Sequence, residues 1–80
     1  MKFQISEELD RILKKSDKPI RNQTLKKIEK ILDNPECGKP LKHDLHNLRS
    51  ERIGKLRILY EIKDDLIVFH TCKHRKKVYK

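Results

Sequence analysis

The sequence contains few of the residues that build the common catalytic and structural motifs. Its 80 residues include two glycines, two cysteines and no tryptophan. Two glycines are too few for a glycine-rich phosphate loop, and Cys37 and Cys72 lack the spacing of a disulfide framework or a zinc site. No serine or cysteine stands in a nucleophile motif, and no two carboxylates are placed for acid–base chemistry. The sequence therefore argues against these familiar catalytic classes.

Long apolar runs are also missing. The N-terminus carries no apolar signal stretch, and no segment is long enough to cross a membrane. Hydrophobic residues make up 35% of the chain, and 80 residues lie near the lower limit for a self-sufficient core. We therefore expect one domain over residues 1–80, cytoplasmic, with free thiols and no membrane contact, and stabilised by a partner.

Basic residues, in contrast, are abundant. The chain has 21 Lys and Arg against 12 Asp and Glu, which gives a net charge of +9. The excess is concentrated in residues 48–80, which hold 10 bases and 4 acids. Such a basic surface suits a polyanion, most often a nucleic-acid backbone, although it also suits an acidic protein partner.

Hydrophobic periodicity predicts an α+β fold of two layers. Residues at the N-terminus alternate like a strand, two segments repeat apolar residues at helical spacing, and the second half is rich in β-branched and aromatic residues. We expect a short N-terminal strand, an antiparallel helical hairpin, and three antiparallel strands that form one sheet packed on the helices. The predicted elements are a strand at 1–5, helices at 6–16 and 17–33, a loop at 35–40, and strands at about 46–53, 56–62 and 66–72.

A tight turn at Asp64-Asp65 fixes the expected register of the last two strands. It pairs Tyr60 with Phe69 and Ile62 with Ile67 on the buried face, because a slip of one residue would separate these apolar side chains. Continued without interruption, the same register pairs Ile58 with Thr71 and Arg57 with Cys72. The face away from the helices is then expected to carry Arg57, Leu59, Glu61, Val68, His70, Cys72 and His74.

A second turn at Gly54-Lys55 places Arg52 opposite Arg57 on that same face. Two opposed arginines repel each other, which favours an anion between them. The alternative is that each arginine pairs with Glu51 or Glu61. Arg49 and Glu51 fall on the core side, so we expect the strand that carries them to be short or bulged.

Two other clusters have weak signals. His70, Cys72 and His74 alternate along one strand and, with His43 or His46, resemble a metal site, but the spacing along a strand is too wide for one tetrahedral ion. We expect no metal and no cofactor. The helix lysines are expected to form a solvated face, with contacts to a phosphate backbone as the alternative; they are Lys14, Lys15, Lys26, Lys27 and Lys30.

The remaining candidates form a phosphate-binding set with proton carriers: Arg52, Arg57, His74, Arg75 and Tyr79. Such a set can support RNA cleavage without a metal ion. A base removes a proton from a 2′-hydroxyl that attacks the adjacent phosphorus, arginines stabilise the developing charge, and an acid protonates the leaving oxygen. The same set can also simply bind nucleic acid.

The segment RIGKLRILYEIKDDLIVFHTCKHRKKVY, residues 52–79, resembles the RelE/ParE superfamily of toxins. The likeness extends over the whole chain, including the lead into the sheet, GKPLKHDLHNLR. It implies a small basic toxin that a cognate RelB-like antitoxin neutralises. RelE-like members cut mRNA on the ribosome, whereas ParE-like members share the fold and inhibit DNA gyrase.

The resemblance also implies roles for individual residues. Arg57 matches the arginine that contacts the scissile phosphate, Arg75 the arginine of the terminal motif, and Tyr79 the terminal aromatic residue implicated in catalysis. His74 stands where some members use a histidine or lysine. Leu48 and Ser50 occupy positions where strongly active RelE members carry lysines, so the general base stays open. Further phosphate contacts are expected from Arg49, Arg52, Lys55, Lys73, Lys76 and Lys77.

Three functions follow as hypotheses. The first is a ribosome-dependent mRNA endonuclease toxin, the second a gyrase inhibitor without a catalytic site, and the third a plain nucleic-acid-binding module. The basic final third of the chain favours RNA.

Overall fold

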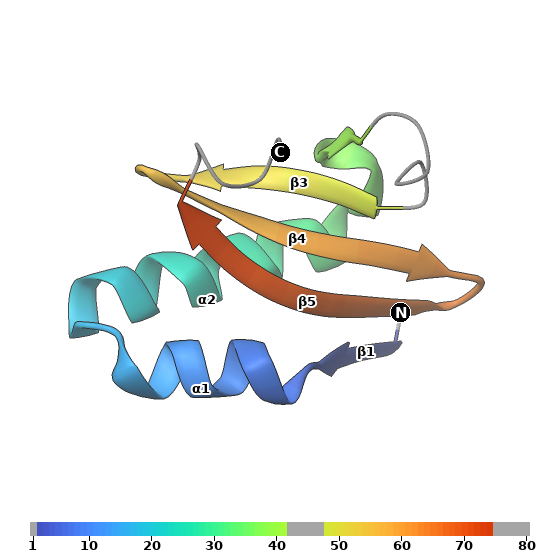
Figure 1. Ribbon diagram of the computed structural model, residues 1–80. Helices are drawn as coiled ribbons and strands as arrows, with labels where there is room; N and C mark the ends of the chain where they lie inside the picture. The colour runs from blue at the N-terminus through green and yellow to red at the C-terminus, as the bar shows by residue number, and fades with distance from the viewer. Residues whose placement is uncertain (1, 42–47, 75–80) are drawn as a thin grey trace.

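The computed structural model describes residues 2–41 and 48–74. Two helices cover one face of a five-stranded sheet (Figure 1), which confirms the predicted two-layer α+β architecture. The elements are β1 (Lys2–Ile5), α1 (Glu7–Lys15), α2 (Lys18–Asp33), the short 3₁₀ helix η1 (Pro35–Cys37), β2 (Lys39–Pro40), β3 (Leu48–Ile53), β4 (Leu56–Lys63) and β5 (Leu66–His74).

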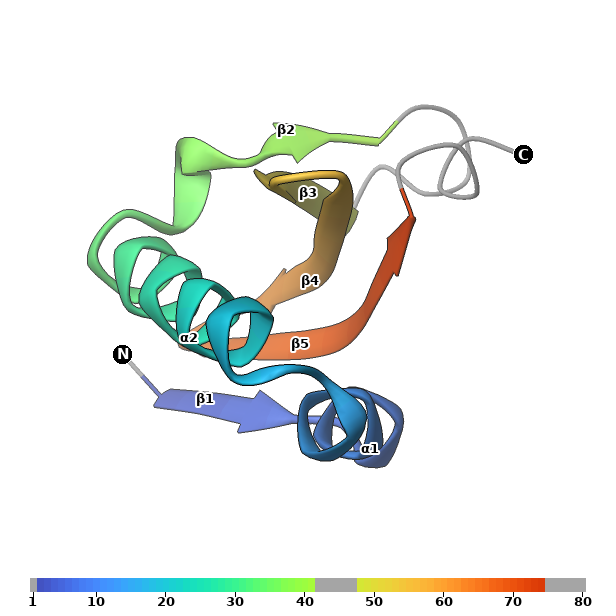
Figure 2. The ribbon, with the colours of Figure 1, turned by 90° about the vertical axis from the view of Figure 1, so that its left-hand side faces the viewer.

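The sheet is larger than the three antiparallel strands that were predicted. Its strand order is β1-β5-β4-β3-β2. The N-terminal strand β1 pairs in parallel with β5, and β2 pairs with β3 inside a segment predicted to be a loop. Figure 2 shows these two short strands at opposite edges of the sheet. A two-residue strand has no alternation to detect, which explains why the sequence did not reveal β2.

The two helices form the predicted antiparallel hairpin (Figure 1). Ser6 caps α1 by accepting a hydrogen bond from the Leu9 N–H at 3.1 Å, whereas Asp17 precedes α2 without a side-chain cap bond. Arg21 of α2 ties the hairpin together, because its Nε donates to the Leu13 carbonyl at 2.9 Å and its Nη2 to the Ser16 carbonyl at 3.0 Å. None of the helices in the described ranges is long and apolar enough to cross a membrane.

The core lies between the helices and the sheet. Tyr60 and Phe69 sit at its centre, fully buried and with their ring centroids 5.9 Å apart. The Tyr60 hydroxyl also fixes η1: it donates to the Pro35 carbonyl at 2.7 Å and accepts from the Gly38 N–H at 2.9 Å. A Cβ atom on Gly38 would lie 2.5 Å from this hydroxyl, so the close approach requires glycine.

The register of β4 and β5 is the predicted one only near the turn. Tyr60 pairs with Phe69 as expected, but a shift between Leu59 and Tyr60 then pairs Ile58 with Cys72 and Arg57 with Lys73. The predicted pairing of Arg57 with Cys72 is therefore wrong. Ser6 explains the shift, because its N–H donates to the Phe69 carbonyl at 3.0 Å and its hydroxyl to the His70 carbonyl at 2.5 Å. The start of α1 thus holds a β-bulge in β5.

Strand β3, in contrast, pairs with β4 over six residues without a shift, so the expectation of a short or bulged strand is wrong. Its two charged core-side residues reach polar partners at the edge of the core. Arg49 Nη1 donates to the Gly38 carbonyl at 2.8 Å and the Glu36 carbonyl at 3.3 Å. Glu51 lies 3.9 Å from Lys27 of α2.

Candidate nucleic-acid interface

A row of three cations crosses the sheet on the face opposite the helices, called the outer face below. Arg52 of β3 pairs with Arg57 of β4, and Arg57 pairs with Lys73 of β5. Neighbouring strands lie about 4.8 Å apart, so the three backbone positions fall within about 10 Å. The row Arg52–Arg57–Lys73 exists because the bulge moves Cys72 out of the position opposite Arg57.

Arg57 is more buried than expected for a residue on the face away from the core. Only 9% of its surface is exposed, and its Nη1 donates to the Ser50 hydroxyl at 3.4 Å. Thr71 of β5, which pairs with Leu59 of β4, is also buried, and its hydroxyl has no hydrogen-bond partner in the described part of the chain. A buried guanidinium stays charged and is poorly screened by solvent. Burial therefore strengthens the electrostatic interactions that Arg57 makes.

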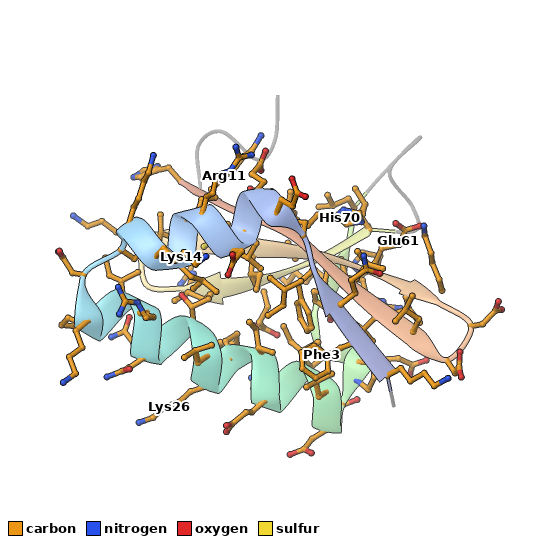
Figure 3. All side chains as sticks on the ribbon, turned by 90° about the horizontal axis from the view of Figure 1, so that it is seen from below. Phe3, Arg11, Lys14, Lys26, Glu61 and His70 are labelled. Carbon is orange, nitrogen blue, oxygen red and sulfur yellow. The ribbon has the colours of Figure 1, made fainter. Side chains whose placement is uncertain are left out.

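The two glutamates that were considered as partners of the arginines have other contacts. Glu51 lies beside Lys27 at 3.9 Å. Glu61 is 2.9 Å from His70 and 3.9 Å from Lys63, and Figure 3 shows His70 and Glu61 next to each other. Within the described ranges, the ion pairs of these two glutamates are thus with Lys27, Lys63 and His70.

A cleft of about 300 Å³ opens beside this row at the edge formed by the short strand β2. We call it the β2–β3 cleft; its lining is Cys37, Lys39, Ser50, Glu51, Arg52 and Arg57. Lys39 was not among the predicted site residues, because only its pairing with Ser50 brings it here. Burial and then Glu51 raise the pKa of Cys37, so its thiol stays protonated near neutral pH and is a poor nucleophile.

A second cleft, of about 410 Å³, lies between α2 and the β3–β4 turn. We call it the α2 cleft; its lining is Gln23, Lys26, Lys27, Lys30, Arg52, Ile53 and Gly54. These lysines were predicted to form a solvated helix face, and Lys26 and Lys30 are exposed as expected. The fold also places them, together with Lys27, along this cleft, and Figure 3 shows the Lys26 side chain pointing away from α2. Arg52 lines both clefts.

The structure brings some of the predicted site residues together and separates others. Arg52, Arg57 and Lys73 share the outer face, and Lys55 is exposed in the adjoining turn. Arg49 faces the helix side, where it binds backbone carbonyls. His74 pairs with Leu56, which packs against the core, so it projects from the opposite face to Arg57. Four predicted residues lie outside the described ranges: Arg75, Lys76, Lys77 and Tyr79.

The expected common outer face of His70, Cys72 and His74 is also wrong, because Cys72 and His74 pair with the core-side residues Ile58 and Leu56, whereas His70 contacts Glu61. Cys72 pairs with the core residue Ile58 and is 7% exposed, and burial raises the pKa of its thiol to about 11. Nearby cations therefore do not activate it. Within residues 2–41 and 48–74, no group of three or more His, Cys, Asp or Glu side chains is placed to hold a metal ion. His43 and His46 lie outside these ranges.

Comparison with known proteins decides the family. The family model described as the ParE toxin of the type II toxin–antitoxin system parDE matches residues 4–79. The chain belongs to the RelE/ParE toxin superfamily. It is a toxin of a type II toxin–antitoxin system, and the resemblance inferred from the sequence is confirmed.

Individual relatives of this RelE/ParE toxin are similar over nearly their full length. A Methanocaldococcus jannaschii protein named RelE4 is 32% identical over 84 residues, which cover 98% of this chain and 89% of that protein. The toxin–antitoxin complex RelBE2 of Mycobacterium tuberculosis contains a chain with a TM-score of 0.80 and 27% identity, covering 92% of this chain and 96% of that one. The RelB–RelE complex of Methanococcus jannaschii contains a chain with a TM-score of 0.73 and 28% identity, covering 94% of this chain and 93% of that one.

Proposed function

We propose that this RelE/ParE toxin is a ribosome-dependent endoribonuclease that cuts mRNA without a metal ion. The observation that carries the proposal is the row Arg52–Arg57–Lys73, in which the central guanidinium is buried. The likeness to the solved RelBE2 and RelB–RelE complexes supports it, since both relatives are of the RelE type by name.

The chemistry follows from the placement of these charges. Attack of a ribose 2′-hydroxyl on the adjacent phosphorus puts negative charge on the non-bridging oxygens of a phosphorane-like transition state. Arg57, held at Ser50 and shielded from solvent, is placed to stabilise that charge more strongly than an exposed cation would. Arg52 and Lys73, on the two sides of Arg57, then bind neighbouring phosphates of the RNA backbone. Arg75 and Tyr79 stay the sequence-based candidates for the second phosphate contact and for proton transfer.

We also propose a RelB-like antitoxin as the partner of this chain. Two of the solved relatives are toxin–antitoxin complexes of the RelB–RelE type by name, and a net charge of +9 favours a partner that presents acidic residues. Expression of the chain alone should arrest growth, and co-expression of an antitoxin encoded beside it should restore growth. Harmless high expression of the folded chain alone would contradict this proposal.

The nuclease proposal is tested by comparing the rates at which the wild type and Arg57→Ala cut a translated mRNA. Primer extension in a cell-free translation reaction measures these rates. Loss of a positioned charged donor should reduce the cleavage rate by about 10²–10³-fold. Arg57→Lys should recover only part of the rate, because an ammonium cannot grip two phosphate oxygens in a planar fork. Lys15→Ala removes an exposed charge from α1, which lies on the other face of the sheet, and should cut normally.

Because Arg57 is buried, its variants need a check of folding by circular dichroism and urea unfolding. A folded Arg57→Ala protein that cuts mRNA at the wild-type rate would contradict the proposal. Cuts inside translated codons by the wild type, and none by a folded Arg57→Ala, would support it.

A second candidate function is inhibition of DNA gyrase, and one observation favours it: the matching family model is that of ParE toxins. The two candidates differ in a direct assay. A gyrase inhibitor would leave translated transcripts intact and would block supercoiling by purified gyrase, whereas the proposed nuclease would cut the transcripts and leave supercoiling unchanged.

A further inference from the structure

The α2 cleft carries a concentration of positive charge that the cleavage chemistry at Arg57 does not use. Gln23, Lys26, Lys27 and Lys30 follow one another at helical spacing on the same side of α2. Arg52 closes the cleft from the β3 side. None of its lining residues is acidic, and Glu51, the acid that lies near Lys27, is at 3.9 Å, the outer limit of an ion pair.

The α2 cleft is continuous with the cationic row on the outer face, because Arg52 belongs to both. Arg52 lines the α2 cleft and the β2–β3 cleft, and it pairs with Arg57 across the sheet. A line of cations therefore runs from the α2 lysines, past the β3–β4 turn, to Arg57 and Lys73. Like charges held this close destabilise the folded chain, and a bound polyanion offsets that cost.

The lining also indicates which kind of polyanion fits. Ile53 is the one large apolar residue of the α2 cleft; the other long side chains are three lysines, an arginine and a glutamine. A groove that receives an amphipathic helix of a protein partner offers several apolar pockets for its anchors. A groove that follows a nucleic-acid backbone needs mainly lysines, arginines and amides that contact phosphate oxygens.

We propose that the α2 cleft binds the phosphodiester backbone of single-stranded RNA next to the segment held at Arg57. The proposal rests on the proposed function and deepens it, because it extends the substrate-binding surface around the β3–β4 turn onto α2. Lys26 and Lys30 contact phosphates, and Arg52 links these contacts to the cationic row. A short RNA held at the row does not reach the cleft, whereas a longer RNA occupies both.

The test is binding of 2′-O-methyl RNA, which lacks the attacking hydroxyl and cannot be cut, to the full-length chain. Fluorescence anisotropy would compare oligonucleotides of about four and about twelve nucleotides over a series of salt concentrations. The slope of log K against log salt is negative, and each lost phosphate contact on a single strand reduces its magnitude by about 0.7. Lys26→Gln/Lys30→Gln should therefore reduce the magnitude of the slope for the long RNA by about 1.4 and leave the slope for the short RNA unchanged.

The matched control is Lys15→Gln/Lys18→Gln, which removes the same charge from exposed positions outside the cleft. It should change the slope for the long RNA much less than the cleft variant does. Equal slopes for the two double variants would overturn the proposal. A loss of binding to an oligoglutamate peptide without a loss of RNA binding would also overturn it, since the α2 cleft would then be a site for an acidic polypeptide.

The mRNA cleavage assay separates this proposal from the proposed function. Normal cleavage by the wild type together with unchanged RNA binding by Lys26→Gln/Lys30→Gln overturns the cleft alone. The predicted change in slope, together with a wild-type protein that leaves translated mRNA intact, supports the cleft and overturns the nuclease.

Discussion

The two halves of the β4–β5 hairpin are built on different principles. Near the turn, Tyr60 pairs with Phe69 in the fully buried core, and apolar alternation alone selects that register. Beyond the bulge, Arg57 pairs with Lys73 on the outer face, and the register there depends on Ser6, a residue far away in the sequence. The comparison teaches that hydrophobic packing fixes the stable half of the hairpin, whereas a distant contact fixes the half that carries the cationic row.

The largest expected difference between the halves is in stability. Phe69→Ala should lower the free energy of unfolding by about 3–5 kcal/mol, since it leaves a cavity in the core. Lys73→Ala, on an exposed side chain of the same strand, should change it by less than about 0.5 kcal/mol. Equilibrium urea unfolding measures both. Similar losses for the two variants would mean that stability is spread evenly along the hairpin.

A smaller effect is expected at the contact that holds the bulge. Ser6→Ala removes the cap of α1 and the hydrogen bond to the His70 carbonyl, and should cost about 1–2 kcal/mol. Amide exchange should accelerate more at Cys72 and Lys73 than at Ile67, since the register beyond the bulge loses its anchor.

Asp17→Ala is the control for this prediction, because Asp17 occupies the corresponding position before α2 without a side-chain cap bond. It should cost only a few tenths of a kcal/mol. Uniform acceleration of exchange along β5 in Ser6→Ala would show that Ser6 stabilises the whole fold and has no particular role at the bulge.

The core half should also give a distinct alkaline response. Burial raises the pKa of Tyr60 from 10.0 to about 12, so the folded state holds this proton more tightly than the unfolded state. Its contribution to stability is therefore complete below pH 10 and is lost as the pH rises toward 12. Tyr60→Phe should lose about 1 kcal/mol at neutral pH, because the Pro35 and Gly38 contacts vanish, and its stability should fall less steeply between these pH values.

Unfolding curves of wild type and Tyr60→Phe at each pH provide that comparison, and the difference between them removes the titration of the many lysines. Parallel declines in the two proteins would contradict a buried, hydrogen-bonded Tyr60. Cys72, whose pKa rises from 9.0 to about 11 through burial, adds a decline of the same sign in both proteins.

The smallest effect should come from a probe that leaves the fold unchanged. In the shifted register Cys72 faces the core, whereas Cys37 is partly exposed. Alkylation by iodoacetamide near neutral pH, followed by mass spectrometry, should therefore modify Cys37 before Cys72. Both thiols should react at similar rates in urea. Rapid modification of Cys72 in the native protein would restore the unshifted register, with Cys72 on the outer face.

Much of the fold was predictable because its determinants are local. Ser6 and the apolar spacing that includes Leu9 and Leu13 predicted α1, and Asn34-Pro35 predicted the end of α2. The contact between Glu61 and His70 was not predictable in the same way. Glu61 could pair with Arg57 or with His70 on sequence grounds, and only the geometry at the bulge selects His70.

The central arginines of the candidate site were predictable from the sequence, whereas the lysines that line its clefts were not. The residues Arg52 and Arg57 followed from a turn at Gly54 and the alternation of side chains, both of which are local. Lys39 and the α2 lysines were missed as cleft residues, because β2 is too short to detect and α2 meets the β3–β4 turn only in the folded chain.

The sequence by itself determined the two-layer architecture, the apolar register of Tyr60 with Phe69, and the basic character of the final third, since each depends on residue type and local spacing. Only the tertiary structure decided that Lys73 stands opposite Arg57, that β1 and β2 complete the sheet, and that Arg52 joins two clefts. These features depend on hydrogen bonds between segments remote in sequence, such as Ser6 with His70. Such contacts cannot be predicted from the alternation of side chains along a strand.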